Sequence, residues 1–133
     1  MLFRSLQTQL CDGVDGAGLG LDLIVANPPF IAGNGGRIYR DGGDQLGAQL
    51  PLAWARACAG RLASGGRLLL YTGSAIIDGD DPFELRLKSA MAELGCEVEY
   101  DEIDPDIFPG LLGRDDYAGV ERIAAVGVVI RRP

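Results

Sequence analysis

The sequence predicts an α/β fold, in which a mainly parallel sheet is built from strands joined by crossover helices. Two apolar runs, residues 21–26 and 67–73, consist of strand-forming residues, and each precedes a segment with helical periodicity. A third strand, at residues 96–104, starts by alternating apolar and acidic side chains, and a fourth apolar run spans residues 122–130. Strands that alternate with helices are typical of parallel sheets with right-handed connections.

The first strand, "LDLIVA" at residues 21–26, is almost continuously apolar, which indicates a strand buried on both faces. It ends at Asn27-Pro28-Pro29-Phe30, since proline cannot donate to a strand ladder. The glycine-rich stretch at residues 12–20 precedes this strand, whereas a phosphate-binding loop follows a strand and opens a helix. We therefore interpret residues 1–20 as a connector and residues 21–133 as the sheet with its helices.

The first helix is predicted from a stripe of apolar residues that recurs at helical spacing. Its members are Leu46, Leu50, Ala53, Trp54, Ala57 and Leu62. We expect Trp54 to be a packing residue on this stripe. The helix is predicted to end at "SGG", residues 64–66, where glycine accepts a left-handed cap.

The second helix has a clear start signal in "DPFE", residues 81–84. Asp81 is the expected N-cap, Pro82 takes the first helical position, and Glu84 is placed to reach back as in a capping box. Its apolar stripe is Phe83, Leu87, Ala90, Met91 and Leu94. Gly95 is expected to end it.

The last two strands have no helix between them, only the loop at residues 105–119. We expect them to pair antiparallel, with the apolar strand 122–130 inside and the acidic, alternating strand 96–104 at the edge. Within the loop, Phe108, Leu111 and Leu112 are predicted to pack locally rather than to dock a partner.

Composition limits the chemistry of the chain. Its 133 residues allow one domain, its net charge is −7, and it has no histidine, which excludes histidine bases and imidazole-based metal sites. Its three cysteines are widely spaced and fit neither a disulfide framework nor a metal site, so we expect reduced thiols in a cytoplasmic protein. The sequence has no apolar run long enough to cross a bilayer.

The Asn27-Pro28-Pro29-Phe30 turn offers a rigid set of hydrogen-bond acceptors beside an aromatic ring. In open α/β sheets, ligands lie at the carboxyl ends of the parallel strands, where this turn is expected. The Asn27 amide and the Pro28 carbonyl can accept two N–H bonds from a planar amine, and Phe30 can stack on the group that carries it. Such a grip favours methyl transfer to a planar nitrogen, because it stabilises charge that develops on that nitrogen.

"DLIVANPPF" at residues 22–30 resembles the Asn/Asp/Ser-Pro-Pro-Tyr/Phe/Trp motif of class I Rossmann-like methyltransferases that use S-adenosylmethionine (AdoMet). "IYRDGGDQLG" and "YTGSAIIDGDDPF" are similar to loops of the "methyltransferase small" branch. The resemblance implies a three-layer fold with strand order 3-2-1-4-5-7-6 and an antiparallel seventh strand, of which this chain supplies strands four to seven. It also implies methyl transfer to an amide or exocyclic amine nitrogen of protein, RNA or DNA, with Asn27, Pro28, Pro29 and Phe30 as catalytic residues.

The same resemblance places Asn27 beside AdoMet, while the family's main cofactor-binding loops have no counterpart in this sequence. We therefore expect the chain to be a C-terminal part of the catalytic domain, inactive in isolation. Tyr39, Arg40, Thr72 and Ser74 are candidate substrate-binding residues, because they lie in loops or at a strand end beside the motif. For each, a plain solvated loop or strand exit is an equally good interpretation.

Two functions follow, an N-directed methyltransferase or a non-catalytic binding and assembly module with the same fold. The expected strand order leaves one side of residues 21–26 unpaired, and an unpaired apolar edge recruits further strands. A homodimer through residues 21–26 is therefore a further prediction.

Overall fold

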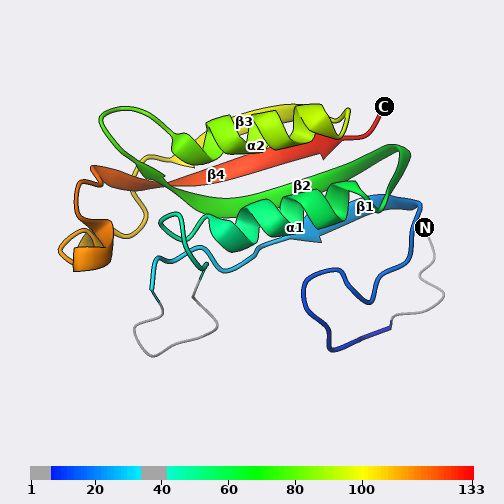
Figure 1. The fold of residues 1–133 in the computed structure, drawn as a ribbon, viewed down its shortest axis with the longest axis horizontal. Helices are drawn as coiled ribbons and strands as arrows, with labels where there is room; N and C mark the ends of the chain where they lie inside the picture. The colour runs from blue at the N-terminus through cyan, green and yellow to red at the C-terminus, as the bar shows by residue number, and fades with distance from the viewer. Residues whose placement is uncertain (1–6, 34–41) are drawn as a thin grey trace.

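The computed structural model describes residues 7–33 and 42–133 as a four-stranded mixed sheet with two helices (Figure 1). The elements are β1 (Leu21–Ala26), α1 (Gln49–Ala59), β2 (Leu62–Ile76), α2 (Pro82–Glu93), β3 (Glu97–Asp104) and β4 (Arg122–Arg131). Two short 3₁₀ turns, Pro109–Leu111 and Asp115–Tyr117, lie between β3 and β4. The predicted α/β class is confirmed.

The order of strands across the sheet is β1-β2-β4-β3. β1 pairs parallel with β2, and β4 pairs antiparallel with both β2 and β3. The expected order, with an inserted antiparallel last strand and an acidic edge strand, is therefore confirmed. β1 and β3 form the two edges of the sheet.

Both helices lie on the same side of the sheet, as expected when two right-handed crossovers progress in one direction (Figure 1). The main core lies between them and the sheet, and includes the fully buried Leu68, Leu87 and Ile130. Burial of such apolar side chains is the main favourable contribution to folding. Among the described elements, only the sheet and this one helical layer are present.

α2 starts at the predicted Asp81 and Pro82, but the reciprocal capping-box bond expected from Glu84 does not form, because its carboxylate pairs with Lys88 instead. Asp81 is extended and accepts a hydrogen bond from the Glu84 N–H at 3.1 Å, while Pro82 begins the helix. The Glu84 carboxylate accepts from Lys88 at 2.6 Å, one turn further along. Gly95 has a φ of 71°, so a left-handed residue ends the helix as expected.

α1 is shorter than predicted and ends at Ala59, before the "SGG" at residues 64–66. Those residues belong to the first part of β2, where Gly65 has a φ of 78° and its N–H donates to the Arg132 carbonyl at 2.6 Å. The predicted helix end was therefore wrong, because the glycines serve an irregular strand instead of a helix cap.

The connector at residues 12–20 packs on α1 near Trp54. A Cβ added to Gly13 would lie 3.1 Å from the Trp54 Nε1, and the Val14 carbonyl accepts a hydrogen bond from Arg61 Nε at 2.8 Å. Trp54 itself is partly buried against the main core, which confirms its packing role. No helix in the described residues is long and apolar enough to cross a membrane.

Candidate functional site at the carboxyl end of β1

The Asn27–Phe30 turn leaves the sheet at the carboxyl end of β1, beside the longer strand β2. Ala26 is paired with Leu70, and β2 continues for six residues beyond that point. The turn therefore runs alongside the second half of β2. In α/β proteins, ligands bind at the carboxyl ends of parallel strands, which is where this turn lies.

Backbone contacts fix the chain that follows the motif. The Ala32 N–H donates to the Tyr117 hydroxyl at 2.7 Å in a buried setting, and the Gly42 N–H donates to the Ile31 carbonyl at 2.9 Å. Gly47 has a φ of 83°, and a Cβ at that position would overlap the Phe30 carbonyl. The close approach of two backbone segments here requires glycine.

The Phe30 ring lies on β2 at Gly73. A Cβ added to Gly73 would overlap the Phe30 ring, so the absent side chain provides the space that the ring occupies. The Phe108 ring also lies near the Phe30 ring, with centroids 6.0 Å apart and planes inclined by 36°. Phe30 is half-buried, which leaves part of its surface accessible to a ligand.

Asn27 is exposed, whereas Pro28 beside it is fully buried. Asn27 lines a cavity of about 390 Å³ on the sheet face that the helices leave free. The other residues that line this cavity are Val25, Ala26, Leu69, Leu70, Tyr71, Asp101, Ile103, Gly127, Val128 and Val129. The wall is therefore mostly apolar, with the side chains of Asn27 and Asp101 and the hydroxyl of Tyr71 as its polar groups.

Side chains alternate along β2, so Gly73 shares a face with Leu69 and Tyr71, while Thr72 and Ser74 point to the helices. Both are buried, with exposed fractions of 0% and 3%. The structure thus places Phe30 on one face of the sheet and these two candidate substrate-binding residues on the other. Their predicted role is not tested by this arrangement, but they do not share a surface with Phe30.

Ser74 belongs to a hydrogen-bonded cluster around Asp81. The Ser74 hydroxyl donates to one Asp81 oxygen at 2.6 Å, and the Tyr100 hydroxyl donates to the other at 2.7 Å. Burial, and then the hydrogen bond to Asp81, raises the pKa of Tyr100 above its ordinary value. Since Asp81 also caps α2, this cluster joins β2, α2 and β3.

The other candidates stand as follows. Tyr39 and Arg40 lie outside the described residues. Phe108 and Tyr117 contact the motif segment, and sequence reasoning did not assign them to the site because both lie in an irregular loop some 80 residues away. Leu111 and Leu112 pack with Tyr117 in a second, smaller cluster, which confirms their local role. The described residues hold no cluster of potential metal ligands.

No protein-family model matches the chain, and no curated protein matches its sequence. Three solved structures of one protein, the "Putative DNA Modification Methylase" of Thermus thermophilus, are similar in fold. One of these structures has a TM-score of 0.47 and 17% sequence identity, and the match covers 93% of this chain and 52% of that one. The complex with S-adenosyl-L-methionine has a TM-score of 0.45 and 18% identity, over 87% and 49%.

The third, a selenomethionine derivative, has a TM-score of 0.41 and 18% identity, over 88% of this chain and 46% of that one. This chain therefore spans about half the length of these structures, between 46% and 52%. At such identities and TM-scores, the similarity carries no argument about the site.

Proposed function

We propose that this chain carries the part of an AdoMet-dependent N-methyltransferase that binds the acceptor amine. The observation that supports it is the placement of Asn27-Pro28-Pro29-Phe30 at the carboxyl end of a parallel strand, with Asn27 exposed and Phe30 half-buried against Gly73. The motif is thus at the sheet edge where ligands bind, and its polar member faces a cavity.

The chemistry assigned to these residues is positioning. The Asn27 side-chain oxygen accepts one N–H bond of a planar amine, and the free surface of Phe30 stacks on the amine's carrier. The second N–H bond goes to the Pro28 carbonyl, which becomes accessible only when the groups that bury Pro28 move aside. Holding both hydrogens directs the nitrogen lone pair out of the plane and stabilises the charge that develops there. The prolines limit backbone motion, so the acceptors lose little entropy on binding.

AdoMet would supply the methyl group, and the described residues fit it only in part. The cavity beside Asn27 has a mostly apolar wall and three polar side chains, Asn27, Asp101 and Tyr71. The amino-acid and ribose groups of AdoMet need several more hydrogen-bond partners than these. We therefore propose that the described residues bind the acceptor amine, and that most of the groups that bind AdoMet are not among them.

A pair of matched ligands tests the grip without the cofactor. 9-Methyladenine carries a planar NH₂ group and 9-methylpurine lacks it, and NMR can follow the Asn27 side-chain amide while each is titrated into the chain. We expect 9-methyladenine to bind about tenfold more tightly, as two net hydrogen bonds imply. Asn27→Ala should abolish the difference, and Asp22→Ala, at an exposed position of β1, should keep it.

Equal binding of the two purines would contradict the proposal. A third titration, with N-acetylglutamine amide, distinguishes a protein amide from a base as the preferred acceptor. Calorimetric titration of AdoMet into the chain tests the second part of the proposal. Micromolar affinity would show that the cofactor's binding groups lie within this chain after all.

A second function, assembly without catalysis, is favoured by the free edge and free face of β1. Leu23 and Val25 are 59% and 72% exposed, and β1 has β2 as its one neighbour among the described strands. Pairing of two β1 edges about a two-fold axis would extend the sheet. We propose this homodimer as the assembled form.

Sedimentation velocity tests the homodimer with a matched pair of variants. The unmodified chain is expected to sediment as a dimer, and Val25→Lys, which puts a charge on the edge strand, as a monomer. Leu85→Lys introduces the same charge at an equally exposed position of α2, where Leu85 is 70% exposed, and should stay dimeric. A monomeric unmodified chain would exclude the edge dimer.

A further inference from the structure

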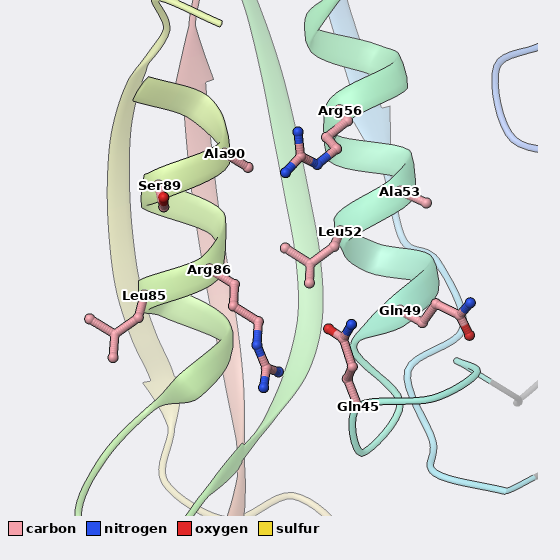
Figure 2. Close-up of a pocket in the computed structure, with 9 residues that line it drawn as sticks. All are labelled: Gln45, Gln49, Leu52, Ala53, Arg56, Leu85, Arg86, Ser89 and Ala90. Carbon is pink, nitrogen blue, oxygen red and sulfur yellow. The ribbon is translucent and has the colours of Figure 1, made fainter. Parts of the chain in front are cut away.

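A second cavity lies between the two helices, away from the face that carries Asn27. It has a volume of about 570 Å³, within the range of ligand sites in proteins. Figure 2 shows that Arg56 of α1 and Arg86 of α2 both extend into the space between the helices, with Leu52 between them and Gln45 at the lower end. The complete lining is Gln45, Gln49, Leu52, Ala53, Arg56, Leu85, Arg86, Ser89 and Ala90.

The charge of this groove is opposite to that of the chain. The sequence has 19 acidic and 12 basic residues, yet the two charged residues that line the groove are both arginine. Arg56 has an ion pair with Glu93 at 3.6 Å, whose side chains are 53% and 66% exposed. Such an exposed pair contributes little to stability, so Arg56 can exchange Glu93 for another anion at small cost. Among the described residues, no acidic partner of Arg86 is recorded.

The neutral polar residue at the lower end is held in a defined conformation. Gln45 and Leu46 have φ values of 58° and 57°, a left-handed conformation that costs a non-glycine residue about 1 kcal/mol or more. Hydrogen bonds from the Ala48 N–H to the Gln45 carbonyl and from the Gln49 N–H to the Asp44 carbonyl hold this turn, at 3.2 and 3.1 Å. The turn thus directs the Gln45 amide into the groove beside Arg86 (Figure 2).

We propose that the groove between α1 and α2 binds a phosphate ester carried on an apolar or flat body, as in a nucleotide. Guanidinium groups bind phosphate oxygens through paired hydrogen bonds, and Arg56 and Arg86 offer two such groups along the groove, with Leu52 between them (Figure 2). Leu52 and Ala90 supply the apolar wall for the body of the ligand.

The groove extends toward the carboxyl end of the sheet. Gln45 and Arg86 also line a smaller cavity of about 140 Å³, which reaches Gly73 and Ser74 of β2. A nucleotide in the groove would therefore lie at the end of the molecule where the Asn27–Phe30 turn is found, with the sheet between them. The inference goes beyond the proposed methyltransferase and stands without it.

Calorimetric titration of the full chain at low salt tests this site with four probes: adenosine, adenosine monophosphate, inorganic phosphate and a single-stranded DNA pentamer. We expect the monophosphate to bind and adenosine to bind at least about tenfold more weakly, since charge-assisted hydrogen bonds are lost. Arg86→Gln and Arg56→Gln should each weaken monophosphate binding about tenfold. Arg67→Gln, at an exposed position of β2, should leave it unchanged.

The remaining outcomes identify the source of the phosphate or overturn the site. Tighter binding of the pentamer, with an affinity that falls as salt rises, assigns the groove to a nucleic-acid strand, and equal binding assigns it to a free nucleotide. Binding of inorganic phosphate alone, equal binding of adenosine, or equal weakening by Arg67→Gln would each overturn the proposal. Because these readouts do not involve Asn27, they are independent of the test with the two methylated purines.

Discussion

The two faces of the sheet differ strongly in how far their side chains are exposed, although both faces carry similar apolar residues. Along β2, Leu68 and Leu70 are 0% and 2% exposed, whereas Leu69 and Tyr71 between and after them are 39% and 41% exposed. All four are apolar or aromatic residues of one strand, and alternation directs them to opposite sides. The helices cover one side. Among residues 7–33 and 42–133, the other side is covered at the end where Phe30 and the small cluster around Tyr117 lie.

This difference corrects the interpretation of the first strand. The continuous apolar run at residues 21–26 predicted burial on both faces, and the exposure of Leu23 and Val25 shows that this was wrong for the described chain. An apolar run shows that these side chains can be buried, but it does not show which face of the sheet other elements cover. The covered face supplies stability, and the open face carries the exposed member of the candidate site, Asn27.

The largest expected effect comes from neighbouring leucines on the two faces. Leu68→Ala should lower the free energy of unfolding by about 2–5 kcal/mol, because it leaves a cavity under the helices. Leu69→Ala should lower it by about 0.5–1 kcal/mol, since the side chain already contacts water. Urea denaturation followed by circular dichroism measures both. Similar losses for the two variants would mean that the open face is covered in solution.

A second test is directed at a place where the open side is tightly packed, the contact of Phe30 with Gly73. Gly73→Ala introduces a methyl group where the Phe30 ring lies, so the ring must move or the strand must shift. We expect a loss of about 1–3 kcal/mol and, in NMR spectra, displaced Phe30 ring resonances. Gly110→Ala is the control, because a Cβ there has nothing within 4 Å. Unchanged Phe30 resonances in Gly73→Ala would show that the ring does not lie on β2.

How far the sequence predicts this molecule depends on whether the determining signal is local. The strand order, the Asp81 cap and the acidic edge of β3 follow from short-range patterns, and the structure confirms them. The end of α1 at Ala59 was mispredicted, because tertiary pairing extends β2 back to Leu62 and overrides the glycine signal.

The candidate site was also predicted only in part, because some of its features depend on local sequence and others on contacts between distant segments. The location of Asn27–Phe30 at a strand end follows from the sequence, whereas the contacts of Phe30 with Gly73 and Phe108 depend on how distant segments meet. Alternation along β2 could have separated Thr72 and Ser74 from Gly73 in advance. It could not have shown which of the two sides the Phe30 ring would occupy.

The covered face also predicts a dependence on alkaline pH. Tyr100 packs on the helical side, and its pKa is raised in the folded protein, so folding favours its protonated form. A raised folded pKa means that its contribution is fully present below the unfolded value of 10.0 and is lost as the pH rises above it. Urea denaturation from pH 9 to pH 11 should therefore show a falling stability.

Two tyrosine variants assign this effect to a face. Tyr100→Phe should remove part of the decline above pH 10.0 and cost about 1 kcal/mol at neutral pH, where the bond to Asp81 is lost. Tyr71→Phe, on the open face, should leave the neutral stability within about 0.5 kcal/mol. An identical decline in Tyr100→Phe and in the unmodified chain would show that other groups cause it.

The smallest effect on stability is expected on the open face. There we expect the binding of a dye to change instead. Val25→Ser and Ile103→Ser replace side chains that are 72% and 63% exposed, so each should alter the free energy of unfolding by less than about 0.5 kcal/mol. The fluorescence of a dye that binds exposed apolar surface should fall in both, because the two residues line the same cavity. Leu94→Ser, just after α2 and 46% exposed, removes an apolar side chain that lines neither this cavity nor the groove between the helices, and should leave the dye signal unchanged. If Leu94→Ser lowered the signal as much as Val25→Ser, scattered leucines rather than a continuous open face would bind the dye, and the contrast between the two faces would lose its functional meaning.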